Sequence, residues 1–347
     1  MKRLWPRRQF NLLLAAGWLD ASSARAGVVD LQKVRLGLTM RNSMVHLPLV
    51  LADQMGYFKP WGIQIEWHDV DAETQTQQAL ASGQVDVVSG AFEQVFDLNE
   101  QGQKIKAFVL QSRTPQVSLG VAMRHLPAFH SMVDLKRLKI GISDWGSTSH
   151  AMAWLWCLQA GLNPRDMAFV AVGSMSSAME SLRSSAVDAL CHLDPLMSWL
   201  EYKSDLRVVA ETRSLQGAQL WLGGPSAGTC LLAKTDFIQN KPELVQGLTD
   251  GVVRALKWLQ TAGPTDFLKS VPSQTWLGDR AFYLGTVDKV RESYSLDGLF
   301  GEELLHTAWR SRALRLGLVR PLAVDRAALQ AAYTNAAVQK SKKRFAI

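Results

Sequence analysis

The sequence is poor in the residues on which disulfide frameworks and redox motifs depend. Among 347 residues it has only three cysteines, Cys157, Cys191 and Cys230, which are widely spaced and form no C-x-x-C pair. This pattern excludes a disulfide framework and a dithiol redox motif. We expect the three cysteines to be small buried apolar residues. A single bridge between Cys191 and Cys230 stays open as an alternative.

Motifs for metal and nucleotide chemistry are lacking as well. The chain has no H-E-x-x-H and no P-loop, and no Lys-Ser or Lys-Thr follows the Gly-rich run 223–228. His46, His150 and His192 fall near expected strand ends, but they come from separate loops without the spacing of metal ligands. The sequence therefore favours a protein that is not an enzyme and that uses neither a metal ion nor another cofactor.

The N-terminal apolar stretch is too short to cross a membrane. It runs from Leu12 to Leu19, whereas a membrane-spanning helix needs roughly 20 apolar residues. The pair Arg7-Arg8 precedes this stretch, and Ala24-Arg25-Ala26 follows it as an A-x-A cleavage site. We predict that residues 1–26 are a twin-arginine signal peptide, with a Sec signal as the alternative. Either route exports a soluble protein to the periplasm.

Most of the positive charge belongs to this leader. The whole chain carries a formal charge of +7, and five basic residues against Asp20 give the leader +4 (5 − 1), which leaves +3 (7 − 4) for the remainder. The one basic run outside the leader, Lys340–Arg344, is expected to be a solvated tail rather than a nucleic-acid site. About 320 residues then remain, enough for two lobes with cores of their own.

The most informative feature is a pattern that occurs twice. A strand around Gly37, an apolar helix and a strand from Ile63 are repeated around Gly141 and from Met167, and both offsets are 104 residues (141 − 37 and 167 − 63). Each copy then continues through a helix into a further strand. Two β-α-β-α-β units predict an α/β protein of two lobes with a hinge and with a ligand cleft at the facing carboxyl ends of their strands.

Breaks in the pattern suggest where the chain crosses between lobes. We expect crossovers near 112–118 and 222–230. Residues 27–115 and 225–347 would then form lobe one with the C-terminal helices packed on it, and residues 116–224 would form lobe two. The last of these helices is expected to span 324–337.

Candidate binding residues lie just after the strand ends, because open α/β sheets bind ligands there. Each such loop leads into the N-terminus of a helix, where free N–H groups and the helix dipole favour an anionic group. The expected ligand-binding residues are Arg41, Asn42, Ser43, Gly90, Ala91, Phe92, Trp145, Ser147, Thr148, Ser149, His192 and Asp194. Simple helix capping by the serines and threonine around Thr148 is the alternative.

Several segments resemble a known family. Pro48–Phe58 followed by Gly62-Ile63 is similar to the "P-x-x-x-A-x-x-x-G-Y-F…G-I/L" signature of ABC importer substrate-binding proteins, in the group of nitrate, taurine, aliphatic-sulfonate and thiamin-pyrimidine-like binders. Leu80–Val87, Leu135–Ile142 and Gly146–His150 match the same pattern in order. The likeness covers roughly residues 33–235.

The resemblance implies a type II periplasmic binding fold and a monomer that captures a small anionic molecule of the sulfonate, taurine or nitrate type. It also implies delivery to an ABC permease in the inner membrane and no role with nucleic acid. Asp144-Trp145 stand where the family commonly has proline or glycine, and this acidic group favours a larger organic anion over nitrate. An enzyme of a cofactor-precursor pathway on the same fold is the alternative.

The leader can be tested directly. Replacement of both Arg7 and Arg8 by lysine should leave unprocessed precursor in the cytoplasm, because the twin-arginine route requires the arginine pair. Cell fractionation and the N-terminal sequence of the product report the outcome. Unchanged processing to Gly27 would show that the Sec route is used instead.

Overall fold

The computed structural model describes residues 31–271, 275, 278–316 and 325–345. The chain divides into two units, Met1–Asp30 and Leu31–Ile347, and every described residue belongs to the second. The signal peptide predicted for residues 1–26 lies outside the described residues and stays a prediction. Among the described helices, none combines the length and the apolar composition needed to span a membrane.

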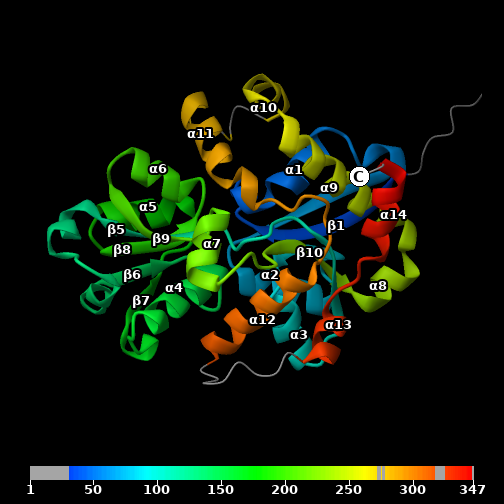
Figure 1. Cartoon of the computed structure of the whole chain (residues 1–347). Helices are drawn as coiled ribbons and strands as arrows, with labels where there is room; N and C mark the ends of the chain where they lie inside the picture. Colours follow the sequence, from blue (N-terminus) through cyan, green and yellow to red (C-terminus); the bar gives the residue numbers. More distant parts are fainter. Residues whose placement is uncertain (1–30, 272–274, 276–277, 317–324, 346–347) are drawn as a thin grey trace, which may run out of the picture. The chain divides into compact units, whose positions relative to one another are not determined.

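The described residues contain two five-stranded sheets, which Figure 1 shows on the two sides of the view. The first sheet has the order β2-β1-β3-β10-β4, with β1 parallel to β2 and β3, and β10 antiparallel to β3 and β4. Its strands are β1 (Gln32–Thr39), β2 (Ile63–Val70), β3 (Val87–Ala91), β4 (Ile105–Leu110) and β10 (Thr229–Lys234).

The second sheet repeats this plan. Its order is β7-β6-β8-β5-β9, again with three parallel strands followed by an antiparallel one, β5. Its strands are β5 (Val117–Ala122), β6 (Lys139–Ile142), β7 (Ala168–Ala171), β8 (Ala189–Leu193) and β9 (Leu206–Glu211). The two-lobed α/β fold expected from the duplicated pattern is therefore confirmed. We call each sheet with its covering helices the first and the second lobe.

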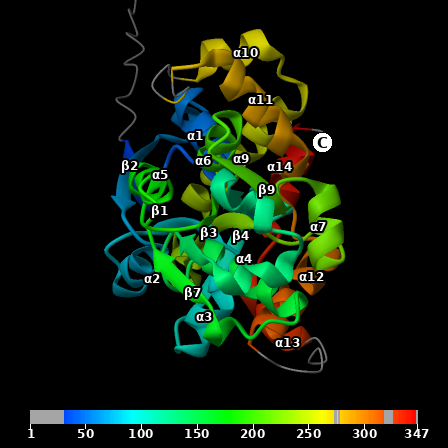
Figure 2. The same ribbon diagram turned by 90° about the vertical axis from the view of Figure 1, so that its left-hand side faces the viewer.

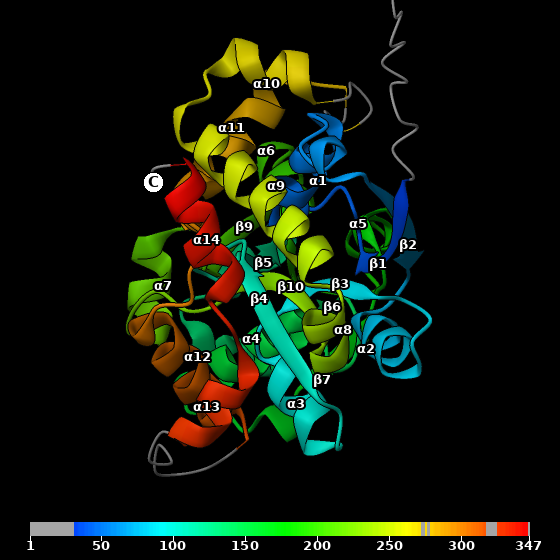
Figure 3. The same ribbon diagram turned by 90° about the vertical axis from the view of Figure 1, so that its right-hand side faces the viewer.

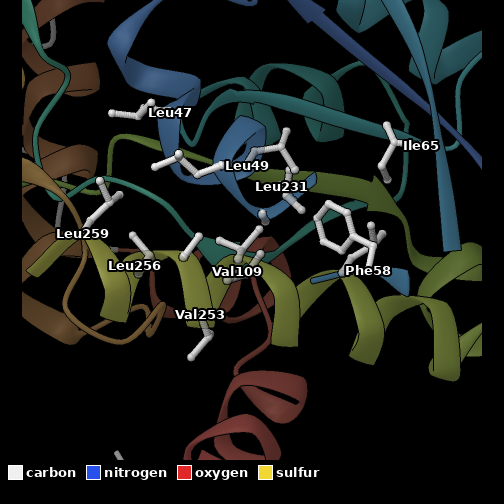
Figure 4. Close-up of a cluster of buried hydrophobic side chains, with 14 of the residues drawn as sticks. Leu47, Leu49, Phe58, Ile65, Val109, Leu231, Val253, Leu256 and Leu259 are labelled. Atoms are coloured by element: carbon white, nitrogen blue, oxygen red, sulfur yellow. The ribbon is translucent and has the colours of Figure 1, made fainter. Parts of the chain in front are cut away.

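Helices cover both faces of the first sheet. Its strands alternate, so that Leu231 and Ala233 of β10 face one core while Cys230 and Leu232 face the other. The first core holds α1 (Leu47–Gln54), α9 (Pro242–Thr261), α10 (Pro264–Ser270), α11 (Arg280–Val290) and α14 (Ala336–Phe345). The second core holds α2 (Glu73–Ser82), α3 (Gln94–Glu100), α12 (Glu302–Arg315) and α13 (Arg326–Ala332). Figure 4 shows α9 with side chains of the first core.

The second lobe, which faces the viewer in Figure 2, is layered in the same way. One core contains side chains of α4 (Thr148–Gln159) and α7 (Leu215–Leu222), and the other contains those of α5 (Met175–Arg183) and α6 (Leu196–Tyr202). Helix α8 (Thr235–Asn240) follows β10. Short 3₁₀ turns complete the described elements at Met44–His46, Lys59–Trp61, Met123–Ala128, Met132–Arg137, Pro164–Asp166 and Arg291–Ser293.

Two chain segments cross between the sheets, residues 111–116 before β5 and residues 212–228 after β9. They are bonded to each other, since the Gly228 N–H donates to the Ser112 carbonyl (3.0 Å) and the Ser226 N–H donates to the Arg113 carbonyl (3.0 Å). A Cβ on Gly228 would lie 2.2 Å from the Thr114 carbonyl oxygen, so only glycine permits this approach. The exact lobe boundaries expected from the sequence stay predictions.

A third segment, residues 291–295, joins the two crossovers. The Arg113 N–H donates to the Ser293 carbonyl (2.7 Å), and the Ser293 hydroxyl donates to the Arg213 carbonyl. Ser112 and Tyr294 form an isolated antiparallel bridge. The sequence pattern predicted two passes of the chain at the hinge, and the structure adds a segment of the first lobe that is bonded to both of them.

The C-terminal helices do not pack on the first lobe alone. Although α9 and α14 cover the first sheet, α11 also contacts α6 of the second lobe. The Phe282 ring lies 5.0 Å from the ring of Trp199, and the Lys289 ammonium is 2.8 Å from the Glu201 carboxylate. The C-terminal helices were expected to pack on lobe one, and the structure adds this contact of α11 with the second lobe.

The expectation of one continuous helix over 324–337 is wrong for the part of this range that the structure describes. It is divided into α13 and α14, with Tyr333 and Thr334 extended between them along β4, the edge strand of the first sheet (Figure 3). The Thr334 N–H donates to the Ala107 carbonyl at 2.8 Å. The helix breaks because its backbone satisfies part of the free edge of that strand.

The basic run 340–344 is part of α14 rather than a solvated tail. Ser341 is fully buried, Lys342 pairs with Asp297 (2.5 Å), and Arg344 forms an ion pair with the buried Asp250. The Arg344 guanidinium also lies 4.7 Å from the centre of the Trp61 ring. The ion pair with the buried Asp250 carboxylate explains why residue 344 is basic. The spacing of the basic residues in the sequence does not reveal this contact.

The three cysteines are free and buried, as expected from their apolar settings. Cys191 belongs to the second sheet and Cys230 to the first, so the alternative of a bridge between them is not realised. Burial raises the pKa of Cys157 to about 12. The thiolate form is therefore disfavoured at neutral pH.

Gly247 and Gly251 let α9 pack closely against the rest of the first lobe, and Gly251 offers a test. A Cβ at Gly251 would stand 2.2 Å from the ring of Phe58, which is labelled in Figure 4. We expect Gly251→Ala to lower the free energy of unfolding by about 1–3 kcal/mol, because the ring must shift within a packed core. Urea denaturation followed by circular dichroism measures this loss.

Gly285→Ala is the matched control, since Gly285 is an exposed helical glycine with nothing near its Cβ position. It should stabilise the protein by about 0.5–1 kcal/mol through helix propensity. Equal effects of the two substitutions would contradict the packing described for α9.

Candidate functional site

A cavity lies between the two lobes, where the carboxyl ends of their strands face each other. It consists of two adjoining parts that share six residues, and we call it the Glu73 cavity. The shared residues are Glu73, Ala91, Gln94, Pro115, Thr148 and Thr229. They come from both lobes and from the first crossover.

The N-terminus of α4 forms the wall that the second lobe contributes. Ser147 is its N-cap and is fully buried, and its hydroxyl accepts the His150 N–H. Ser149 is bonded to Ser143 and Ser147 within the same lobe. Of these three residues, only Thr148 directs both its N–H and its hydroxyl across the cavity. Ser147 therefore caps the helix, whereas the donors of Thr148 face the opposite lobe.

Thr148 binds a carboxylate of the opposite lobe. Its N–H lies 3.2 and 3.1 Å from the two carboxylate oxygens of Glu73, and its hydroxyl donates to one of them at 2.8 Å. The Gln94 amide donates to the same carboxylate at 3.1 Å. A further bond, from the Thr74 hydroxyl to Asp144 (3.2 Å), runs beside this contact. The N-terminal turns of α2 and α4 are thereby joined.

The cavity is rich in carboxylates. Glu73, Glu93 and Asp97 line it together with Arg315, whose guanidinium is 3.1 Å from Glu93. Burial raises the pKa of the Glu73 carboxyl, against the hydrogen bonds from Thr148, and burial likewise raises that of Glu93 against the charge of Arg315. Arg315 Nε and Gln94 Oε1 have no hydrogen-bond partner. Both a donor and an acceptor therefore remain open.

A second cavity lies near the ends of β1 and β8, and we call it the methionine cavity after Met40, Met175 and Met179. Leu193 borders both cavities. Beside it the lobes touch directly, since the Asp194 carbonyl accepts from the Ser43 hydroxyl (3.0 Å) and from the Met44 N–H (2.9 Å). The interlobe space is thus divided in two.

The residues expected at one ligand site are distributed over both cavities. Gly90, Ala91, Ser147 and Thr148 line the Glu73 cavity. Asn42, Ser43, His192 and Asp194 line the methionine cavity. Ser149 is 1% exposed and lines neither cavity. Whether these residues contact a ligand stays a prediction.

Three expected residues lie elsewhere. Phe92 is fully buried in the core against Phe96 and Phe300, so the prediction that it lines the cleft is wrong. Arg41 is already paired with Asp69, and its guanidinium lies 4.7 Å from the Trp67 ring centre. Trp145 is 53% exposed and packs edge-on against His150, outside both cavities. Position after a strand does not fix the direction of a side chain.

Glu73, Gln94 and Arg315 were not anticipated. Glu73 follows β2 as the first residue of α2, and it therefore lies at the same edge of the sheet as the other candidates. That rule could have singled out Glu73. Arg315 lies in α12, far along the chain, and no local signal links it to the site.

The described residues show no arrangement for a metal ion. They contain no group of three His, Cys, Asp or Glu side chains that could hold a metal ion. His192 uses both ring nitrogens, one toward the Gly173 carbonyl and one toward the Leu193 N–H. Residues 224–228 spell G-x-S-x-G, yet Ser226 is buried in the segment that leads into β10, not in a strand-to-helix turn.

Two sheets of matching strand order, joined by paired crossovers and enclosing an interlobe cavity, define a type II periplasmic binding fold. The chain belongs to the NMT1-like family, whose sequence model matches residues 29–269. The resemblance to the substrate-binding proteins of ABC importers is confirmed at the level of family and fold. No curated protein sequence matches the chain.

Solved structures are similar over nearly the whole length. A protein from Bordetella bronchiseptica RB50 is 33% identical, with a TM-score of 0.84 over 91% of this chain and 98% of that one. The alkanesulfonate-binding protein SsuA from Xanthomonas axonopodis pv. citri, bound to MOPS, is 18% identical, with a TM-score of 0.68 over 87% and 98%. The nitrate-binding protein NrtA from Synechocystis PCC 6803 is 12% identical, with a TM-score of 0.67 over 91% and 89%.

The same fold also occurs in an enzyme. The desulfurization enzyme DSZB is 14% identical and has a TM-score of 0.57 over 90% of this chain and 99% of that one. Fold alone therefore does not separate binding from catalysis.

His46 provides a pH-dependent test of the cavity wall. Its ring lies in the Glu73 cavity with Nδ1 2.8 Å from the Ser89 hydroxyl, and burial lowers its pKa to about 4. Between pH 4 and about 6.5, the usual histidine value, the unfolded chain binds a proton that the folded protein does not. The free energy of unfolding should therefore fall as the pH decreases through this window, by up to about 1.4 kcal/mol per pH unit.

His46→Gln should lower the slope of the unfolding free energy against pH by the contribution of one proton. Urea denaturation at pH 7, 6 and 5 measures this slope. Burial also lowers the pKa values of His150 and His192, so part of the slope should remain. An unchanged slope would show that His46 is protonated in the folded protein.

Proposed function

We propose that this protein is the periplasmic substrate-binding component of an ABC importer and that it captures a small organic anion in the Glu73 cavity. One observation carries the proposal. The N-terminus of α4 already holds a carboxylate through the N–H and the hydroxyl of Thr148. Donors placed to hold a carboxylate there suit an anionic group of a ligand equally well.

The nature of the ligand follows from the rest of the lining. Ala91, Pro115, Ala151, Met152 and Ala227 offer apolar contacts to a carbon chain. Arg315 adds a positive charge with an open donor. An organic sulfonate fits this combination better than a bare oxyanion such as nitrate. The alkanesulfonate binder SsuA, which holds the sulfonate MOPS, is consistent with this choice.

The remaining parts of the proposal come with this role. The protein would be exported, act as a monomer, deliver its ligand to an inner-membrane permease, and release it unchanged. Because DSZB shares the fold, the last point needs its own test. Mass spectrometry of the ligand after incubation should recover the starting compound only.

A ligand screen tests capture itself. Thermal unfolding of the protein from Gly27 onward should shift upward with 1-butanesulfonate or MOPS and not with nitrate, because only the organic anions also bury a carbon chain. Failure of every sulfonate to shift the unfolding midpoint, together with no heat of binding in titration calorimetry, would reject the proposed ligand class.

Arg315→Gln tests the place of the anion. Loss of a hydrogen bond to a charged group costs about 1.5–3 kcal/mol, so the dissociation constant for 1-butanesulfonate should rise roughly tenfold to hundredfold. Arg310→Gln is the matched control, since Arg310 lies on the same helix and lines neither interlobe cavity. Equal affinity of the two variants would place the anion away from Arg315.

A further inference from the structure

Two helix N-termini from opposite lobes share one carboxylate. Glu73 is the first residue of α2, and Thr148 is the first residue of α4. The N–H and the hydroxyl of Thr148 and the amide of Gln94 all donate to Glu73. These donors come from both lobes. The bound carboxylate therefore connects the two sides of the cavity.

The same donors are those that an anionic ligand would use, and little room is left beside Glu73. Water molecules can place their centres in only about 50 Å³ of the outer part of the cavity and about 20 Å³ of the inner part. The N–H and the hydroxyl of Thr148 both already donate to Glu73. The carboxylate and the charged group of a ligand cannot both lie at Thr148.

Gln94 gives independent evidence that the cavity takes a ligand. It is 6% exposed and lines both parts of the cavity. Its amide nitrogen binds Glu73, whereas its Oε1 has no partner. A buried acceptor without a partner is costly, and such a group is expected where a ligand or water completes the bonding.

We propose that Glu73 sets the affinity of this cavity for anions by occupying, in the ligand-free protein, the position that the anionic group of the ligand takes. The carboxylate holds the empty lobes together through Thr148, and the ligand displaces it. This inference rests on the proposed function. Each anion must then bind against the free energy of the Glu73–Thr148 contact and against the negative charge of the displaced side chain.

Glu73→Ala removes the competing group and leaves every donor in place. We expect it to bind 1-butanesulfonate at least tenfold more tightly than the unaltered protein in titration calorimetry. Glu73→Gln should lie between the two, because an amide offers one acceptor oxygen and no charge. Glu243→Gln is the control, since Glu243 is an exposed residue in the first turn of α9. It should leave the affinity unchanged.

Small-angle X-ray scattering of the ligand-free proteins provides a second readout. Loss of the contact between the lobes should increase the radius of gyration of the Glu73→Ala protein, and saturating 1-butanesulfonate should reverse this increase. The Glu243→Gln protein should scatter like the unaltered one.

Two results would overturn the inference. Weaker sulfonate binding by Glu73→Ala would mean that Glu73 contacts the ligand rather than competing with it. A ligand-free radius that does not grow would mean that the carboxylate does not hold the lobes. By contrast, a radius that grows while no variant binds any sulfonate would reject the proposed anion and retain the closing role of Glu73.

Discussion

The main-chain pairing of β10 is the constraint on which the rest of the structure depends. This strand returns from the second lobe and enters the first sheet between β3 and β4, antiparallel to both. Its arrival brings Gly228 against the first crossover and places Thr229 in the Glu73 cavity. The helices that follow it then cover both faces of the first sheet. The Glu73 cavity, the hinge and the cores of the first lobe therefore all depend on this one strand.

Much of this architecture could be predicted from the sequence, because it is encoded in local periodicity. The repeated β-α-β-α-β pattern predicted two sheets, and the structure gives them matching strand orders. Breaks in the sequence pattern near 112–118 and 222–230 indicated the crossovers. Contacts between distant segments were not predictable in this way. The division between α13 and α14 depends on Ala107 in another strand, and the basic run depends on Asp250 in α9.

The candidate site shows the same limit. The rule that ligands lie at strand carboxyl ends identified Gly90, Ala91 and Thr148, which do line the cavity. The rule gives the backbone position and not the direction of the side chain, so Phe92 turned out to be in the core. The contact between the two lobes could not be predicted from the sequence either. The partner of Thr148 is Glu73, 75 residues earlier, and only the folded chain brings the two together.

The segment that is bonded to both passes at the hinge has a mechanical consequence. A joint with two parallel passes can both bend and twist. Here residues 291–295, a segment of the first lobe, are bonded to both crossovers, and α11, just before it, rests on α6 of the second lobe. A twist of one crossover against the other must stretch these bonds, whereas a bend that moves both crossovers together can keep them. The hinge therefore favours bending over twisting.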